Sequence, residues 1–288
     1  MKRVQAATMR HYLAAMRSHH VDRRWDVTPF ESLTLHRIVN GAARLYAKPK
    51  TARLPITMDI LRRITAAPAK SKLELNLRAC YLVAFAGFMR MGELTYTERE
   101  TLDGKEFFRT KITRSCVRFS ANYDHATILL KRSKTDVDHE GVTILLAATF
   151  NSTCPVQALR DLFSGDPRRS DDPLFNWNGS AFTKSRLQAA LNKALLTHGI
   201  DPASYRLHSF RKGAAQHAVD SGMREDQVMA LGGWSSQAFR VYFTHRRQHC
   251  TQTVFSSRQG NRSPLVLYNT NTCSPHTVSV GTTEDTSQ

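Results

Sequence analysis

The sequence of 288 residues is poor in cysteine and has no long apolar run. Its five cysteines lie far apart, without a Cys-x-x-Cys pair or a histidine at zinc-finger spacing, which argues against a disulfide framework and against a zinc site. No apolar run approaches the roughly 18 residues of a membrane-spanning helix, and no signal-peptide stretch opens the chain. We therefore expect a protein of a reducing, intracellular compartment with no membrane partner and no metal.

Acidic residues are also scarce relative to basic ones. The chain has 41 Lys and Arg against 24 Asp and Glu, a formal net charge of +17. Such an excess repels itself in the folded state and usually faces an anionic partner, of which nucleic acid is the commonest. An acidic membrane surface is the alternative, but no basic amphipathic segment stands out as an anchor. The charge therefore favours nucleic-acid binding.

Hydrophobic periodicity divides the first hundred residues into helical segments. From about residue 6 to residue 46, apolar residues recur every three or four positions, which predicts two or three short helices. The basic, proline-bounded stretch that follows has the composition of a linker. Thr57 and Asp59 then predict a capped helix start. Leu75 to Leu94 predicts a buried helix that runs into a turn at Gly92.

Three segments rich in β-branched residues follow, with the sequences "SCVRF", "ATILL" and "GVTILLAA". They predict a small antiparallel sheet, and helical patterns return from Pro155 onward. After about residue 249, Ser, Thr, Asn and Gln predominate without periodicity, which predicts a disordered tail over residues 250–288. The expected fold class is therefore mainly α with a small antiparallel β-sheet (α+β).

A His-x-x-Arg pair, His208 and Arg211, opens one predicted helix with Ser209 as its expected N-cap. The spacing alone says little, because about one such pair is expected by chance in a chain with this many histidines and arginines. His20 and Arg23 repeat it in a segment that we expect to be a solvated basic surface. The pair therefore has to be judged by what surrounds it in the fold.

Three other polar features have ordinary explanations when each is taken alone. Arg90 follows an apolar helix and could be a helix-end cation. Lys131, Arg132 and Lys134 lie between two predicted strands, where a solvated hairpin tip is the simpler explanation. In "LGGWSSQAFRVYFTH", the tyrosine could be a core aromatic. These residues are Arg90, Lys131, Arg132, Lys134, Trp234 and Tyr242.

Taken in order, these features resemble the active-site series of the tyrosine recombinase (phage integrase) superfamily. "GFMRMGEL" resembles the first-arginine box, "RSKTD" the hairpin lysine, "HSFRKGAA" the His-x-x-Arg box and "LGGWSSQAFRVYFTH" the nucleophile box. Strings such as "LPIT", "SKTD" and "HSFRKGAAQHA" are similar to recombinases of eukaryotic mobile elements, in particular the fungal, Crypton-like group. Four motifs in order are far more specific than any one of them.

The resemblance implies a domain organisation and a partner. Residues 1–48 would form a shortened helical DNA-clamping domain, 49–55 a basic linker, 56–249 the tyrosine recombinase catalytic domain and 250–288 a tail. The partner would be double-stranded DNA, bound by a homo-tetramer in the nucleus. Phosphate contacts are expected from Lys48, Lys50, Arg53 and Arg132.

The resemblance also implies a chemistry. Tyr242 would be the nucleophile that forms a 3′-phosphotyrosine and frees a 5′-hydroxyl, while Arg90 and Arg211 clamp the non-bridging oxygens. Lys134 would protonate the leaving oxygen as general acid, with Lys131 as the less favoured substitute. Because the covalent intermediate keeps the bond energy, the reaction would need no metal, ATP or other cofactor.

Supporting roles fall to three further residues by the same resemblance. His208 would orient the phosphate or assist proton movement, Trp234 would pack and hydrogen-bond in the site, and Glu93 would hold Arg90. The leading hypothesis is thus a DNA strand transferase, a site-specific recombinase. Two alternatives stay open: an inactive or domesticated DNA-binding protein that keeps the fold, and a relaxing type IB topoisomerase.

Overall fold

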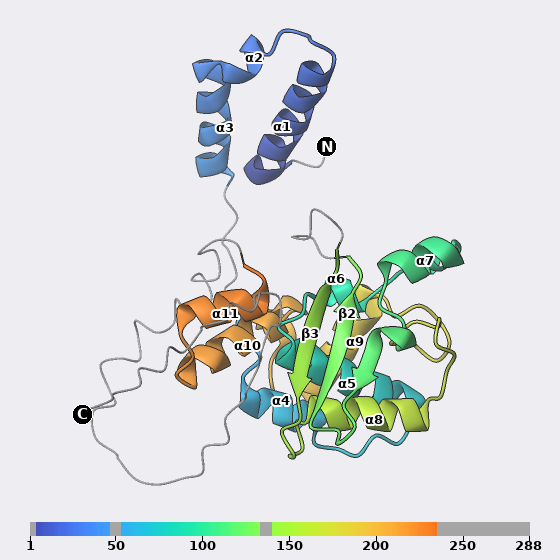
Figure 1. Cartoon of the computed structure of the whole chain (residues 1–288). Coiled ribbons are helices and arrows are strands. Elements are labelled where there is room, and N and C mark those ends of the chain that lie inside the picture. Colours follow the sequence, from blue (N-terminus) through green and yellow to red (C-terminus); the bar gives the residue numbers. More distant parts are fainter. Residues whose placement is uncertain (1–3, 47–52, 133–139, 235–288) are drawn as a thin grey trace, which may run out of the picture. The chain divides into compact units, whose positions relative to one another are not determined.

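The computed structural model describes residues 4–46, 53–132 and 140–234, and all structural statements below concern these ranges (Figure 1). The chain divides into two compact units, Met1–Ala52 and Arg53–Gln288, which are described separately. Within the described ranges, no helix combines the length and apolar character needed to cross a membrane. The same ranges contain no cluster of three His, Cys, Asp or Glu residues that could hold a metal ion.

The first unit consists of helices α1 (Ala6–Asp22), α2 (Thr28–Glu31) and α3 (Leu33–Leu45). Its helices lie where the apolar periodicity predicts them. Polar contacts join them: Arg10 Nη2 donates to Asn40 Oδ1 at 2.9 Å, and Arg17 Nη2 lies 3.2 Å from Glu31 Oε1. The unit therefore combines a helical hairpin with a surface rich in cations.

The second unit is mainly helical with one three-stranded sheet, which confirms the fold class expected from the sequence. Its helices are α4 (Met58–Thr65), α5 (Lys72–Ala86), α6 (Met91–Leu94), α7 (Gly104–Thr110), α8 (Pro155–Gly165), α9 (Lys184–Thr197), α10 (His208–Asp220) and α11 (Glu225–Gly232). Short 3-10 helices are η1 (Glu98–Thr101), η2 (Arg114–Cys116) and η3 (Pro202–Ser204), and the strands are β1 (Val117–Phe119), β2 (His125–Leu130) and β3 (Val142–Ala147).

The sheet has the order β1-β2-β3, and both strand pairs are antiparallel. Ile128 in the central strand pairs with Val117 on one side and with Ile144 on the other. Alternate residues of β2 are buried, namely Ala126, Ile128 and Leu130. The period of two places these side chains on the face that covers the core.

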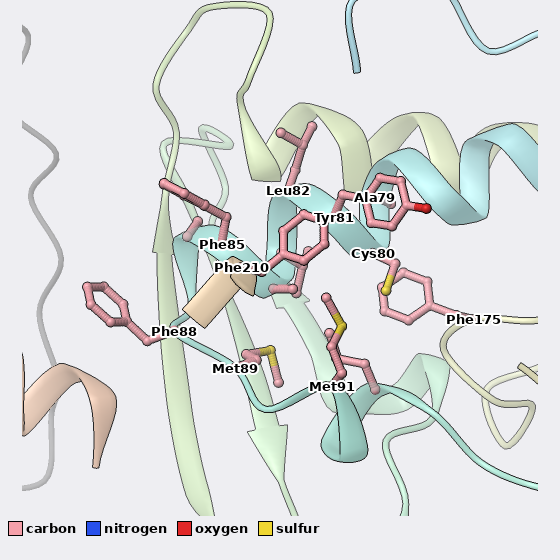
Figure 2. Packing of buried hydrophobic residues seen from close by; sticks show 14 of the residues in the cluster. Ala79, Cys80, Tyr81, Leu82, Phe85, Phe88, Met89, Met91, Phe175 and Phe210 are labelled. Carbon is pink, nitrogen blue, oxygen red and sulfur yellow. The ribbon is translucent and has the colours of Figure 1, made fainter. Parts of the chain in front are cut away.

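Helix α5 forms the centre of the unit. Every residue from Ala79 to Ala86 is buried, and the helix contacts α4, α6, α8 and α10. Tyr81 of α5 stacks on Phe210 of α10 with ring centroids 5.1 Å apart, and Figure 2 shows both rings within the core. A helix that is apolar all round is stable only when other elements surround it. This burial fixes the turn that follows α5, which carries the first candidate site residue.

That turn does not lie at Gly92, as the sequence suggested. Helix α5 ends at Ala86, the chain turns through Gly87, Phe88 and Met89, and Gly92 lies inside the short helix α6. The turn comes earlier because Phe88 adopts a left-handed backbone conformation, with φ 51°. Such a conformation ends a helix whichever residue adopts it.

Helix α4 begins as the sequence predicts, because Thr57 Oγ1 accepts a hydrogen bond from the Ile60 amide at 3.2 Å. Just before it, the Ile56 amide donates to Ser209 O of α10 at 2.9 Å. A Cβ atom at Gly213 of α10 would lie 1.7 Å from Ile56 O, so this approach requires glycine. The segment that enters the second unit is therefore fixed against the helix that carries the His-x-x-Arg pair.

The prediction that Ser209 caps α10 is wrong. The helix begins one residue earlier, at His208, after Leu207 with helical φ −54° and ψ −30°, and no side chain caps it. Ser209 is 1% exposed, and its Oγ accepts a hydrogen bond from the Arg206 amide at 3.1 Å. The hydroxyl thus stabilises the preceding turn instead of the first turn of the helix.

Candidate phosphate-binding site

Helix α10 buries Arg211 in the second unit. Arg211 is 3% exposed, and its guanidinium donates through Nη1 to Phe88 O and through Nη2 to Gly232 O. The guanidinium carbon also lies 4.2 Å from the centre of the Trp234 ring, close enough for a cation–π contact. Contacts on the edge and the face of the guanidinium fix its plane.

Arg90 begins the short helix α6 and is held by Glu93. Arg90 Nη1 lies 3.0 Å from Glu93 Oε1, and the Arg90 amide donates to Glu93 Oε2 at 2.7 Å. The Glu93 side chain is 10% exposed and that of Arg90 is 29% exposed. The structure therefore brings Glu93 and Arg90 together with the contact that the resemblance implied, and it leaves the arginine partly open to a ligand.

The two arginines line one small cavity of about 40 Å³, together with Phe88, Glu93 and Gly232. A cavity of this size accommodates a group little larger than a water molecule. A wider cavity of about 690 Å³ is also lined by Arg90. Cationic groups from α6 and α10 are thus directed to the same small space, as the recognition of one phosphate would require.

His208 lies in the electrostatic field of both arginines. Partial burial of its ring, followed by the nearby charges of Arg211, Lys212 and Arg90, lowers the pKa of His208 below its usual value. Part of the residue remains exposed to solvent. The imidazole is therefore kept neutral near pH 7 and can accept a proton or a hydrogen bond.

Trp234 reaches this site because α11 ends in glycine. A Cβ atom at Gly232 would lie 1.8 Å from Cζ3 of the Trp234 ring. The other face of the cluster is Phe88, whose ring meets that of Trp234 edge-on at a centroid distance of 6.3 Å. Sequence reasoning missed Phe88, because no motif marks the backbone conformation that brings it there.

Lys131, the less favoured candidate for general acid, is engaged elsewhere. Its Nζ donates to Phe108 O, lies 3.3 Å from Thr113 Oγ1 and stands 3.7 Å from the Phe108 ring centre. These contacts hold the ammonium group against the segment from α7 to Thr113. Arg132 is exposed and lines the wider cavity beside Lys131.

Several sequence predictions fall outside the described residues: Lys134, Tyr242, Lys48 and Lys50. Of the expected DNA contacts in the linker, Arg53 is described, and its Nη1 donates to Ala203 O at 2.6 Å. The roles proposed for all site residues remain predictions.

The second His-x-x-Arg pair has a different environment. The His20 ring meets Trp25 and Phe30 edge-on, at centroid distances of 5.4 and 4.9 Å, and its Nδ1 lies 2.8 Å from Asp26 O. Arg23 stands 5.2 Å from the Trp25 ring centre. His20 is therefore packed into a small aromatic cluster rather than solvated, as we expected from the sequence.

Residues 55–249 match the Phage integrase family. The chain belongs to this family. The match covers more than half of the chain, and it contains the described site and the segment with Tyr242. No curated protein sequence matches the chain.

Three solved structures illustrate the likeness in fold. XerH site-specific recombinase bound to difH substrate is 14% identical, with a TM-score of 0.49 and coverage of 84% of this chain and 68% of that chain. Tn1549 transposon integrase in complex with circular intermediate DNA is 13% identical, with a TM-score of 0.49 and coverage of 83% and 75%. A lambda integrase dimer bound to a COC' core site is 13% identical, with a TM-score of 0.45 and coverage of 90% and 68%. The family assignment rests on the match over residues 55–249.

Proposed function

We propose that this phage integrase family member is a site-specific DNA recombinase that cuts and rejoins strands through a 3′-phosphotyrosine. The observation that carries the proposal is the cavity shared by Arg90 and Arg211, beside a histidine whose pKa both arginines lower. Two permanently charged guanidiniums in one small space suit the two non-bridging oxygens of a phosphodiester. The family membership and the net charge of +17 support DNA as the partner.

In the proposed reaction, the Tyr242 phenolate attacks the scissile phosphorus while the bond to the 5′ oxygen breaks. The phenol loses its proton, for which neutral His208 is a suitable acceptor, and the leaving oxygen takes a proton from Lys134. Arg90 and Arg211 neutralise the charge that grows on the non-bridging oxygens. The attack of a second 5′-hydroxyl on the phosphotyrosine reverses these steps and joins the new strand.

Covalent selection from random-sequence DNA tests this proposal and identifies the DNA site in the same experiment. The full chain is incubated with a pool of random-sequence duplexes, the reaction is stopped with detergent, and DNA that remains attached to protein is sequenced. We expect wild type to enrich one sequence family and Tyr242→Phe to retain none. A duplex of that sequence, nicked next to the cleavage point, should then accumulate the adduct because the cut end diffuses away.

The matched control is a variant that keeps DNA binding but lacks the nucleophile. Tyr242→Phe should bind the selected duplex as tightly as wild type, with an affinity that falls steeply with salt. Adduct formation by Tyr242→Phe, or no adduct from wild type on any duplex, would contradict the proposal.

A DNA-binding protein without turnover is the second candidate. The burial of Arg211 and its two bonds to backbone carbonyls are contacts that a purely structural arginine would also make. This candidate predicts binding that depends on salt, without an adduct. Relaxation of plasmids that lack the selected sequence would instead favour a type IB topoisomerase.

The finer aspects of the proposal concern biological context. The resemblance of "LPIT", "SKTD" and "HSFRKGAAQHA" to Crypton-like recombinases supports a role in a eukaryotic mobile element, acting in the nucleus as a tetramer on DNA. Short repeats at the flanks of the gene would mark such an element. Sedimentation of the complex with the selected duplex would test the tetramer.

A further inference from the structure

Phe88 is a buried residue in a strained conformation directly beside the candidate site. Its φ of 51° lies in the left-handed region, where a bulky side chain is uncommon, and the residue is 3% exposed. Residues held in this way tend to cluster at functional sites, where surrounding contacts maintain the strain. Contacts around Phe88 show what the conformation achieves here.

The left-handed turn directs the Phe88 carbonyl to Arg211, which donates to it through Nη1. It also separates Phe88 from its neighbour: in Figure 2, Met89 points into the core cluster while the Phe88 ring points away from it. That ring meets Trp234 edge-on at 6.3 Å, with the ring planes at 83°. Trp234 in turn covers the Arg211 guanidinium at 4.2 Å.

One residue therefore touches the second arginine in two ways, through its carbonyl and through the indole that covers the guanidinium. Only Met89 separates Phe88 from the first arginine, Arg90, in the chain. Phe88 and both arginines line the same cavity of about 40 Å³. The spacing between the two arginines therefore depends on the conformation of this turn.

We propose that Phe88 is a positioning residue that sets Arg90 and Arg211 at the separation needed to clamp one phosphate. The inference rests on the proposed function for its catalytic consequence, but not for the contacts themselves. The ring and the strained backbone act together: the ring braces Trp234, and the turn aims the carbonyl. Loss of the ring would release Trp234 and, with it, one face of the Arg211 guanidinium.

Phe88→Leu is the test variant, because it keeps an apolar side chain of similar bulk but removes the aromatic edge. Phe175→Leu is the matched control, since Phe175 is 1% exposed and packs on Phe182, at a centroid distance of 5.7 Å. Both variants should lose similar stability in urea. Only Phe88→Leu should slow adduct formation per folded molecule, by about 10- to 100-fold, because misplaced catalytic groups lose rate steeply.

A methylphosphonate at the scissile position separates positioning from packing. Replacing a charged non-bridging oxygen with a methyl group removes the charge that the arginines neutralise. The rate difference between wild type and Phe88→Leu should therefore largely disappear on this substrate. A deficit that persists on it, or an equal deficit in Phe175→Leu, would show that Phe88 only fills space.

Tryptophan fluorescence gives a readout that needs no turnover. With Trp25→Phe and Trp177→Phe as background, Trp234 is the remaining tryptophan. Phe88→Leu should increase its quenching by acrylamide, whereas Phe175→Leu should leave it unchanged. Unchanged quenching in Phe88→Leu overturns the positioning inference. If wild type forms no adduct but quenching rises as expected, the contact stands and the proposed function falls.

Discussion

Arg114 and Arg211 are equally buried, each 3% exposed, but their surroundings differ. Arg114 lies 3.6 Å from the Asp166 carboxylate and 4.8 Å from the Phe163 ring. Arg211 donates to two backbone carbonyls and lies under Trp234. A carboxylate neutralises a cation, whereas carbonyls and an indole ring orient it without cancelling its charge. The comparison suggests that the Arg114 environment stabilises the fold and the Arg211 environment presents charge to a ligand.

The surroundings of Arg114 form a buried polar network. Asp166 is 1% exposed and accepts hydrogen bonds from Asn76, Arg168 and Asn176, at 3.1, 3.1 and 2.7 Å. Burial lowers the pKa of Arg114 to about 10, although Asp166 acts in the opposite direction. The network joins α5, the end of α8 and the segment before α9, so its function is to hold the core elements together.

Arg211→Ala should give the largest effect and bears directly on this comparison. We expect adduct formation to fall by about 10³-fold, as for the removal of a donor to a developing oxyanion. The rate is measured under single-turnover conditions on the selected nicked duplex. Arg114→Ala is the matched control and should keep the wild-type rate per folded molecule. Comparable rate losses in the two variants would mean that the environments do not divide the roles as proposed.

Arg114→Ala should instead lose stability. Removing it leaves the buried Asp166 carboxylate paired with Arg168 at 3.1 Å and with Lys72 at 3.8 Å. We expect the free energy of unfolding to fall by about 3 kcal/mol, the order seen when one partner of a buried pair is removed. Urea unfolding measures it. The double variant Arg114→Met, Asp166→Asn, which removes both charges, should recover part of the loss.

The two environments were not equally visible in the sequence. Arg90, Arg211 and His208 could be selected because residue types in a fixed order carry the family motif. The helices and the sheet followed from periods of three to four and of two. Arg114 and Phe88 could not be found, since an ion pair with Asp166 and a positive φ depend on chain segments that meet only after folding. For the same reason, Gly92 and Ser209 were assigned to a turn and a cap that they do not form.

Glu93→Gln should have an intermediate effect on the other arginine. Glu93 both pairs with Arg90 Nη1 and accepts its amide, so the amide side chain keeps one acceptor but loses the charge. We expect adduct formation to slow by about tenfold, as for partners that orient the groups contacting a ligand. Glu106→Gln is the control, because Glu106 pairs with Arg109 at an exposed site. A wild-type rate in Glu93→Gln would show that Arg90 needs no such support.

Acid should weaken the Arg114 environment. Burial of Asp166 raises its pKa, but hydrogen bonds from Asn176, Arg168 and Asn76 together outweigh burial and lower it. A carboxyl whose pKa is lower in the folded state contributes stability above its unfolded value, near 3.9, and loses it as the pH falls through the folded value. Urea unfolding between about pH 3 and pH 6 should therefore depend less on pH in Asp166→Asn than in wild type. An unchanged dependence would contradict the role of this carboxylate.

The smallest expected effect concerns the charge that Arg211 presents. Burial and the cations Arg211, Lys212 and Arg90 lower the pKa of His208, so its NMR titration midpoint should lie below about 6.5. Because the folded pKa is depressed, the unfolded chain binds more protons, and the stability contributed by neutral His208 is lost as the pH falls below that value. Arg211→Ala should raise the midpoint, and Arg114→Ala should not. Binding of duplex DNA should raise it as well, since a phosphate between the arginines offsets their charge at the imidazole. A midpoint that responds to neither Arg211→Ala nor DNA would mean that the field of Arg211 is already neutralised within the protein, as that of Arg114 is by Asp166.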